Sequence, residues 1–240
     1  MNIYEEHALQ EMKKWQREIS KKPSIINKMT KGIQRKTNNL IPEKAHRVIT
    51  ETIKNISKTV IIGSEYITRQ PLVEASLEER ERQVLDRLNF YRKAAVVEGA
   101  GTGAGGILLG LADFPLLLSL KMKFLFDTAS IYGFDVRDYR ERLYILFVFQ
   151  LAFSSRQRQV ELYYQMENWE NYVHSLPMDM NDFDWRTFQQ EYRDYIDLAK
   201  LMQLVPGIGA VVGAYANYKL MDKLGETALN AYRMRVFRKV

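Results

Sequence analysis

The chain of 240 residues has no cysteine and few of the residues that usually carry catalysis or bind metals. Without cysteine it has no disulfides, thiolate metal sites or cysteine nucleophiles, which fits a reducing compartment. The three histidines, His7, His46 and His174, are scattered and have no i, i+4 partner, so we predict no metal site. Walker loops, Gly-x-Ser-x-Gly elbows and His-Glu-x-x-His motifs are also missing. These absences favour a non-enzymatic protein without a cofactor, and an enzyme is the alternative.

The N-terminus lacks the features of a secretion signal, because MNIYEEHALQEMKKW has acids where bases are needed and no continuous apolar core. We therefore expect a cytoplasmic location. The net charge is +6, but residues 1–62 hold thirteen Lys or Arg against six Asp or Glu, so the basic character belongs to the N-terminal quarter. Such a region attracts anionic lipid, nucleic acid or an acidic protein surface. Since the basic residues form no recognised nucleic-acid module, we predict no nucleic-acid partner.

Apolar residues recur at helical spacing along the chain and no convincing strand is present, which predicts an all-α fold of largely one domain. We divide it into a basic amphipathic region, 1–70, and a helical domain, 71–240. In the first helix, five apolar residues share one face: Tyr4, Ala8, Met12, Trp15 and Ile19. This helix either packs on the protein by that face or anchors the protein at a membrane surface. The candidate anionic-lipid contacts are Lys13, Lys14, Arg17, Lys21 and Lys22.

Caps and breakers delimit the helices of the second region. Ser76 and Glu79 form a capping box at the start of one helix, and Gly133 is placed to end a later helix as a left-handed C-cap. Asp135 is expected to cap the next helix. The uncharged centre of that helix, residues 143–155, is too short to span a bilayer and predicts a core helix buried nearly all round.

Three further helices are expected in the C-terminal half, with Asp184 as the cap of the middle one. One is expected over residues 157–176, where apolar residues recur at helical spacing and a proline follows. The last helix ends in a basic tail that contains Arg233 and Arg235. We interpret these arginines as complements to the negative end of the helix dipole.

The segments that ordinary helix formation does not explain are rich in glycine and cover residues 94–120 and 204–219. Small residues four apart in both segments would let two helix backbones approach closely, so we expect the segments to pack together. The 22 residues between Glu98 and Lys121 contain one charge, Asp113, and could nominally cross a bilayer. The break at residues 113–115 and the cations at both ends favour a hairpin returning to one side, or a pair buried in a soluble core.

One glycine spacing, Gly101-x-Gly103-x-x-Gly106, matches the dinucleotide-binding fingerprint as a string. That motif works only between a strand and a helix. Here a helical pattern leads into it, so we predict no dinucleotide.

The glycine segments also carry a family resemblance. The runs GTGAGG, GLADFP and YGFD, followed by VPGIGAVVGAYANY, resemble the EcsC family of bacterial proteins, and the chain is similar to members close to the family's namesake. The resemblance covers roughly residues 75–238. It implies no established catalytic activity. It does imply a link to an ABC transporter, because the family is named for a gene that neighbours the genes of two transporter components.

These observations give one leading hypothesis for function. We expect a non-enzymatic, membrane-associated accessory protein on the cytoplasmic face of the cell membrane, with an anionic membrane surface and ABC transporter components as partners. The alternatives are a soluble enzyme or small-molecule-binding protein with a pocket against the glycine segments and Asp113, and a helical adaptor that never touches lipid. The candidate membrane or partner contacts are Gly99, Gly101, Gly103, Gly106, Gly110, Asp113, Pro115, Pro206, Gly207, Gly209, Gly213 and Asn217.

Overall fold

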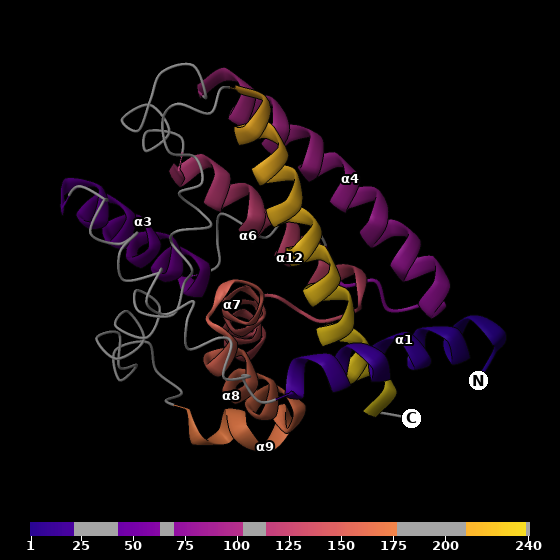
Figure 1. Cartoon of the computed structure of the whole chain (residues 1–240). Helices are drawn as coiled ribbons and strands as arrows, with labels where there is room; N and C mark the ends of the chain where they lie inside the picture. Colours follow the sequence, from indigo (N-terminus) through magenta and orange to yellow (C-terminus); the bar gives the residue numbers. More distant parts are fainter. Residues whose placement is uncertain (22–42, 63–69, 103–113, 177–209, 239–240) are drawn as a thin grey trace.

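The computed structural model describes residues 1–21, 43–62, 70–102, 114–176 and 210–238. Over these ranges the protein is all-α, as predicted, and has no β-strand (Figure 1). The elements are α1 (Ile3–Ser20), α3 (Glu43–Ile62), α4 (Leu77–Thr102), α6 (Phe114–Ile131), α7 (Tyr139–Phe153), α8 (Arg156–Glu167), α9 (Trp169–Tyr172), the 3-10 helix η1 (Val173–Ser175) and α12 (Ala210–Arg238).

The two longest described helices, α4 and α12, lie side by side in opposite directions (Figure 1). Gly225 of α12 makes this packing close, because a Cβ atom there would stand only 2.5 Å from a methyl carbon of Leu88 on α4. The missing side chain leaves the space that the buried Leu88 fills. This pair forms the long axis of the structure, against which α1, α6 and α7 pack.

Helix α7 forms the centre of the core. Its residues 143–153 are all buried, which confirms the expected core helix. Tyr144 donates a hydrogen bond to the carbonyl of Ala231 on α12 over 2.7 Å, so its buried hydroxyl is satisfied. Its ring also stands edge-on to Trp169, with centroids 5.0 Å apart.

The ends of α4 and α6 confirm two predicted caps. Ser76 Oγ accepts from the backbone N–H of Glu79 at the start of α4, over 3.2 Å. Gly133 follows α6 with φ +87°, the left-handed conformation expected of a C-cap. The expected cap of α7 was wrong, because Asp138 rather than Asp135 accepts from the first turn, at the N–H of Arg140.

The helix expected over 157–176 is broken at Asn168. Helix α8 ends at Glu167, and Asn168 has φ −114° and ψ 38°, outside the helical range, before α9 begins at Trp169. This change of direction takes the indole of Trp169 into the core, where it is 2% exposed. Its ring packs edge-on against Tyr144 and Phe147 of α7. The helix that Asp184 was expected to cap lies outside the described residues.

Helix α1 packs against α12, α8 and α4 with the face that was predicted to be apolar. Ala8, Met12 and Ile19 are buried, and Trp15 packs beside them with its ring edge-on to Tyr163, with centroids 6.3 Å apart. Asn2 caps the helix through a capping box with Glu5. The apolar face of α1 is therefore occupied by protein.

Candidate functional site

The glycine segments meet the described structure at one end of the α4–α12 pair. Helix α4 ends just after Gly99 and Gly101, and α12 begins just before Gly213. Close to this end, Asn217 is 1% exposed and donates to the carbonyl of Ala95, over 3.3 Å. These helix ends lie together at the top of Figure 1.

The register of the antiparallel pair continues toward the glycines. Going up α4, Leu88 meets Gly225, Arg92 meets Asp222, and Ala95 meets Asn217. Each step up α4 is matched by a similar step down α12, as two straight antiparallel helices require. One more turn in this register brings α4 to Gly99 and α12 to Gly213. Most of the two glycine segments lies outside the described residues, so their packing together stays a prediction.

The start of α6 belongs to the same end. Tyr91 of α4 donates to Asp127 of α6 over 3.1 Å, and Arg80 donates to the carbonyl of Ile131 over 3.0 Å. Helix α6 therefore also runs antiparallel to α4, and its first turn points to the end at which α4 finishes (Figure 1). Pro115 lies in that first turn and is exposed.

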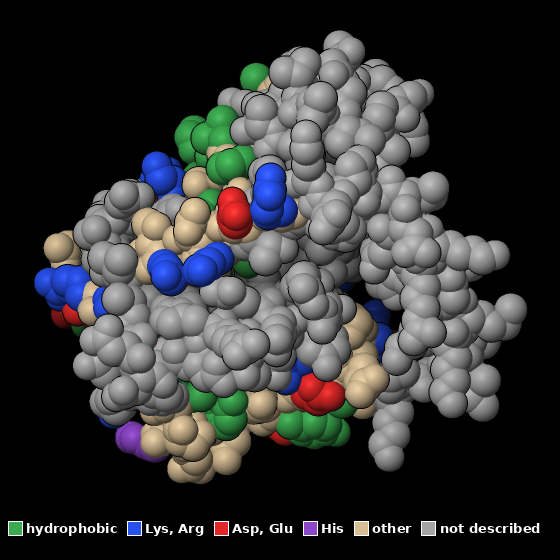
Figure 2. Space-filling view, turned by 90° about the vertical axis from the view of Figure 1, so that its left-hand side faces the viewer, with side chains coloured by type: hydrophobic (Ala, Val, Ile, Leu, Met, Phe, Trp, Pro, Cys, Tyr) green, Lys and Arg blue, Asp and Glu red, His purple; other side chains and the backbone are tan. Residues whose placement is uncertain are grey.

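Several large apolar side chains are exposed at this end. Val97 of α4 is 70% exposed, Tyr215 of α12 is 62% exposed, and Leu116 of α6 is 45% exposed. Lys93 and Lys219 are exposed nearby on α4 and α12. We call these five residues the apolar end. In the view from the left of Figure 1, hydrophobic side chains gather in the upper part of the face, with Lys or Arg side chains near them (Figure 2).

The other predicted site residues divide into two groups. Lys13, Lys14, Arg17 and Lys21 lie on α1 or directly after it, and Lys21 pairs with Glu18 over 2.6 Å at the surface. The second group lies outside the described residues, so the pocket expected against Asp113 does too. These residues are Lys22, Gly103, Gly106, Gly110, Asp113, Pro206, Gly207 and Gly209.

A buried ionic network lies at the opposite end of the α4–α12 pair. Arg233 of α12 binds both carboxylate oxygens of Glu81 on α4, over 2.7 and 2.6 Å, and also binds Glu11 of α1 over 2.9 Å. Glu81 is 1% exposed and also accepts from the hydroxyls of Tyr4, over 2.8 Å, and Tyr132, over 3.1 Å. One buried carboxylate thus joins α1, α4, α6 and α12.

The network shifts the acidity of the groups around it. Burial alone would lower the pKa of the Arg233 guanidinium, but the hydrogen bonds and charge of Glu81 outweigh it and raise that pKa. Burial, followed by the hydrogen bond to Glu81, raises the pKa of Tyr4 to about 12. Both groups stay protonated at neutral pH, so they act as fixed hydrogen-bond donors rather than as acid–base catalysts.

A second buried arginine adds a specific partner to the interpretation of the basic tail. Arg235 is 8% exposed and binds both oxygens of Glu141 on α7, over 2.5 and 2.7 Å. Its guanidinium also lies 3.8 Å from the ring centre of Phe134. Arg233 and Arg235 therefore each pair with a carboxylate inside the protein. Arg235 and Arg238 also lie in the last turn of α12, as the dipole interpretation expects.

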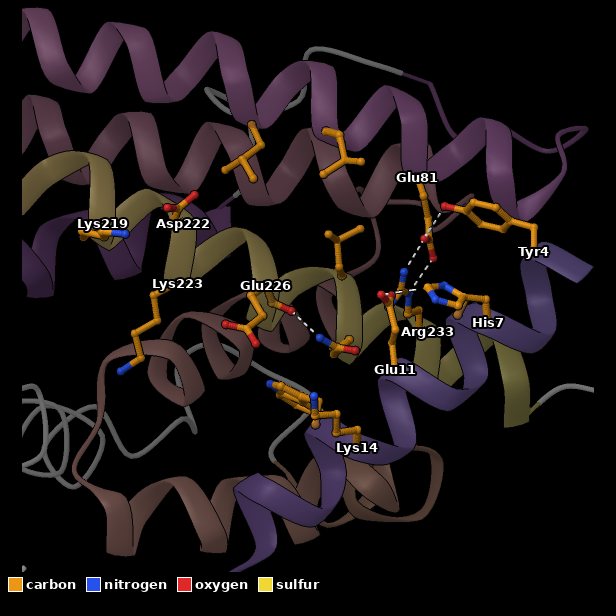
Figure 3. A pocket seen from close by; sticks show the side chains of 16 residues that line it. Tyr4, His7, Glu11, Lys14, Glu81, Lys219, Asp222, Lys223, Glu226 and Arg233 are labelled. Carbon is orange, nitrogen blue, oxygen red and sulfur yellow. Dashed lines mark hydrogen bonds and ion pairs between the residues drawn. The ribbon is translucent and has the colours of Figure 1, made fainter. Parts of the chain in front are cut away.

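A cleft opens between α1 and the α4–α12 pair, beside the Glu81–Arg233 network (Figure 3). Its volume is about 890 Å³, within the range of small-molecule sites. Helix α1 forms one wall, and α4 and α12 form the others. The lining residues are Tyr4, His7, Ala8, Glu11, Lys14, Trp15, Glu81, Leu85, Leu88, Lys219, Asp222, Lys223, Glu226, Leu229, Asn230 and Arg233.

A lysine on α6 is buried without an acidic partner in the described part of the chain. Lys121 is 2% exposed, and its Nζ has one hydrogen bond, a long one of 3.4 Å to the carbonyl of Leu117. Burial lowers the pKa of this ammonium to about 8. A lone buried cation costs stability, and this one lies away from the cleft residues.

Sequence reasoning missed Glu81 and Lys121 as internal charges, although their spacing signals burial. Glu81 falls four residues after Leu77 and three before Val84, on the stripe that packs α4. Lys121 falls midway between Leu117 and Leu125, which are both buried. In both helices the sequence places a charged residue among the apolar residues of the buried face, and this pattern could have predicted an internal charge. The cleft had no such signal, because its walls come from distant parts of the chain.

The fold and these sites describe an all-α protein with internal ion pairs and a cleft lined by charged residues. Comparisons with known proteins place it in a family. The model of the EcsC protein family matches residues 6–237, and the chain belongs to this family. The match begins within α1 and therefore includes the N-terminal region outside the resemblance recognised from the motifs.

Two relatives come from Bacillus subtilis (strain 168). Protein EcsC is 48% identical over 231 residues, which cover 96% of this chain and 95% of that protein. The uncharacterized protein YdbA is 26% identical over 253 residues, which cover 95% of this chain and 90% of that protein. No solved structure gives a significant match.

Proposed function

We propose that this protein is a non-enzymatic accessory protein that binds the cytoplasmic face of the cell membrane through the apolar end of its α4–α12 pair. The observation that carries the proposal is the exposure of Val97, Leu116 and Tyr215 at the end where both glycine segments meet the helices. Large apolar side chains that stay exposed in a folded protein are typical of contact sites when several occur at one end of the structure.

The chemistry of the apolar end favours a bilayer as the occupant. Tyrosine is enriched where membranes meet water, because its ring is apolar and its hydroxyl is polar. Lys93 and Lys219 flank the apolar side chains and would meet anionic headgroups, at about 1 kcal/mol for each cation. None of the described helices is long and apolar enough to cross a membrane. The contact we propose is therefore interfacial.

We do not assign the lipid contact to the basic face of α1. The apolar side of α1 is buried in protein, so Lys13 and Arg17 offer a membrane only their charge. The Tyr4–Glu81 contact places α1 near the start of α4, and Glu81 to Gly99 spans about 27 Å of helix. We propose that lipid contact lies at the apolar end, and that the basic face of α1 serves an acidic surface such as an ABC transporter component.

Co-sedimentation with vesicles of phosphatidylglycerol and phosphatidylcholine tests the lipid contact. We expect Val97→Glu and Tyr215→Glu each to weaken binding by about tenfold or more, because each puts an acid where apolar contact is needed. The matched control is Tyr164→Glu on α8, where the tyrosine is 55% exposed but lies away from the apolar end. Equal loss in the control would indicate general charge repulsion and contradict the proposal.

The same assay separates the apolar end from α1. If α1 makes the lipid contact instead, Lys13→Glu with Arg17→Glu will abolish binding while Val97→Glu leaves it intact. The proposal predicts the reverse order of effects. It also predicts that part of the binding persists at high salt, since screening weakens the contribution of Lys93 and Lys219 but not the apolar contact.

A further inference from the structure

The cleft between α1 and the α4–α12 pair has charged groups that the protein's own network already uses. At one end Arg233 is bound by Glu81 and Glu11. Further along, Asp222 pairs with Arg92. These groups are neutralised within the protein and are poor candidates for holding a ligand.

Two charged side chains of the cleft are not held by this network: Glu226 has no partner among the described residues, and Lys14 has only an electrostatic interaction with the exposed Glu18. Lys14 on α1 and Glu226 on α12 are both exposed, and they lie on facing sides of the cleft (Figure 3). Their charges are opposite. A bound molecule that meets both must carry an anionic group for Lys14 and a cationic or donor group for Glu226.

A third group, Asn230, supplies an acceptor that is already desolvated. Asn230 is 6% exposed and lines the cleft. Its Nδ2 donates to the carbonyl of Glu226 over 2.9 Å, which fixes the orientation of the amide. Its buried Oδ1 has no hydrogen-bond partner. A buried acceptor without a donor costs free energy, so a donor on a ligand would be favoured here.

The charge balance of the whole lining selects among ligand classes. The lining holds four acidic residues, Glu11, Glu81, Asp222 and Glu226, against four basic ones, Lys14, Lys219, Lys223 and Arg233. Because acids and bases are equal in number, the lining has no net charge that would favour a polyanion or a simple cation. A molecule that carries both signs fits this lining better than either.

We propose that this cleft binds a small zwitterion, a molecule with one ammonium and one anionic group a few bonds apart. The ammonium donates to Asn230 Oδ1 and faces the Glu226 carboxylate. The anionic group pairs with the Lys14 ammonium, and Trp15 contributes an apolar wall to the site. The cleft shares Lys219 with the apolar end but is not lined by Val97, Leu116 or Tyr215, so substitutions at those three residues test the lipid contact separately.

Calorimetric titration of the full-length protein tests the proposal. The probes are phosphoethanolamine and a series of ω-amino carboxylates from 3-aminopropanoate to 6-aminohexanoate, with butylammonium and butyrate as singly charged controls. We expect at least one zwitterion to bind about tenfold or more tightly than either control. Failure of every zwitterion to bind, or equal binding of the controls, would overturn the proposal.

Three substitutions assign the binding to the cleft. Lys14→Gln, Glu226→Gln and Asn230→Leu should each weaken zwitterion binding by about tenfold. The first two change exposed residues, so they should leave folding intact, and a melting curve checks all three. The matched control is Lys13→Gln, a neighbouring lysine of α1 that does not line the cleft. Unchanged binding in Lys14→Gln and Glu226→Gln would refute the assignment.

A zwitterion of this kind could be a free metabolite or the headgroup of a lipid, and competition distinguishes the two sources. Vesicle binding to phosphatidylethanolamine that soluble phosphoethanolamine displaces indicates the headgroup. Binding of the soluble probe without such displacement indicates a free molecule. Val97→Glu should leave zwitterion binding unchanged in either case, so failure of the proposed lipid contact would not be mistaken for failure of this site.

Discussion

Replacing Lys121 with methionine should stabilise the protein, because it removes a buried charge while keeping a side chain of similar length. Lys121 is 2% exposed and has a single hydrogen bond of 3.4 Å to a backbone carbonyl. Burial lowers its pKa from 10.5 to about 8. A shift of that size corresponds to about 3 kcal/mol of unfolding free energy. For a chain of this length, we expect the melting temperature to rise by about 6–12 °C.

The pH dependence of this gain follows from the direction of the pKa shift. Below about pH 8, lysine is charged in both the folded and the unfolded protein, so the folded state bears the full cost of burial. As the pH rises from about 8 to 10.5, the folded protein loses this proton before the unfolded protein does, and the cost falls. The advantage of Lys121→Met should therefore be largest at neutral pH and shrink to about 1 kcal/mol near pH 10.

Urea denaturation at several pH values measures this advantage, and a nearby lysine provides the control. Lys123 lies on the same helix but is exposed, so Lys123→Met should change the unfolding free energy by less than about 0.5 kcal/mol. A Lys121→Met variant that is no more stable than the original at neutral pH would contradict the reasoning. So would a gain that does not change with pH, because that would indicate better packing rather than removal of a charge.

Three further predictions concern the α4–α12 pair and the C-cap of α6, each measured by urea denaturation. Arg233→Met should cost about 3–5 kcal/mol because it leaves Glu81 buried and unpaired, and adding Glu81→Leu should recover most of the loss; no recovery would contradict the pairing. Gly225→Ala should cost about 1–3 kcal/mol against Leu88, but should stabilise a Leu88→Ala background, where the space is open. Gly133→Ala should cost about 1–3 kcal/mol because of its positive φ, and a neutral result would contradict that strain.

The sequence predicted those features of the helical fold that depend on a single local effect, such as the burial of an uncharged helix or a glycine at a helix end. Residues 143–153 contain no charge, so burial on all sides was the only stable arrangement for that helix, and α7 has it. Gly133 ends α6 as expected because a left-handed residue is needed there and glycine adopts that conformation without strain. Local chemistry was sufficient in both places.

Tertiary contacts explain what the sequence did not predict. Nothing in the local sequence breaks the helix at Asn168, and the break depends on the fit of Trp169 against α7. Arg233 was interpreted as a complement to the helix dipole because its partner, Glu81, lies far away in the chain. The cleft is similar, since Lys14 and Glu226 come from opposite ends of the sequence and meet only in the folded protein.

The most direct test of the proposed function is to measure where the protein touches a bilayer. The chain has no cysteine, so Val97→Cys or Tyr215→Cys provides a single site for a polarity-sensitive fluorophore. Asn171→Cys, at an exposed position of α9, serves as the control. The proposal predicts that anionic vesicles shift the emission to the blue at positions 97 and 215 but not at 171. An unchanged emission at positions 97 and 215 in a protein that still sediments with the vesicles would contradict it.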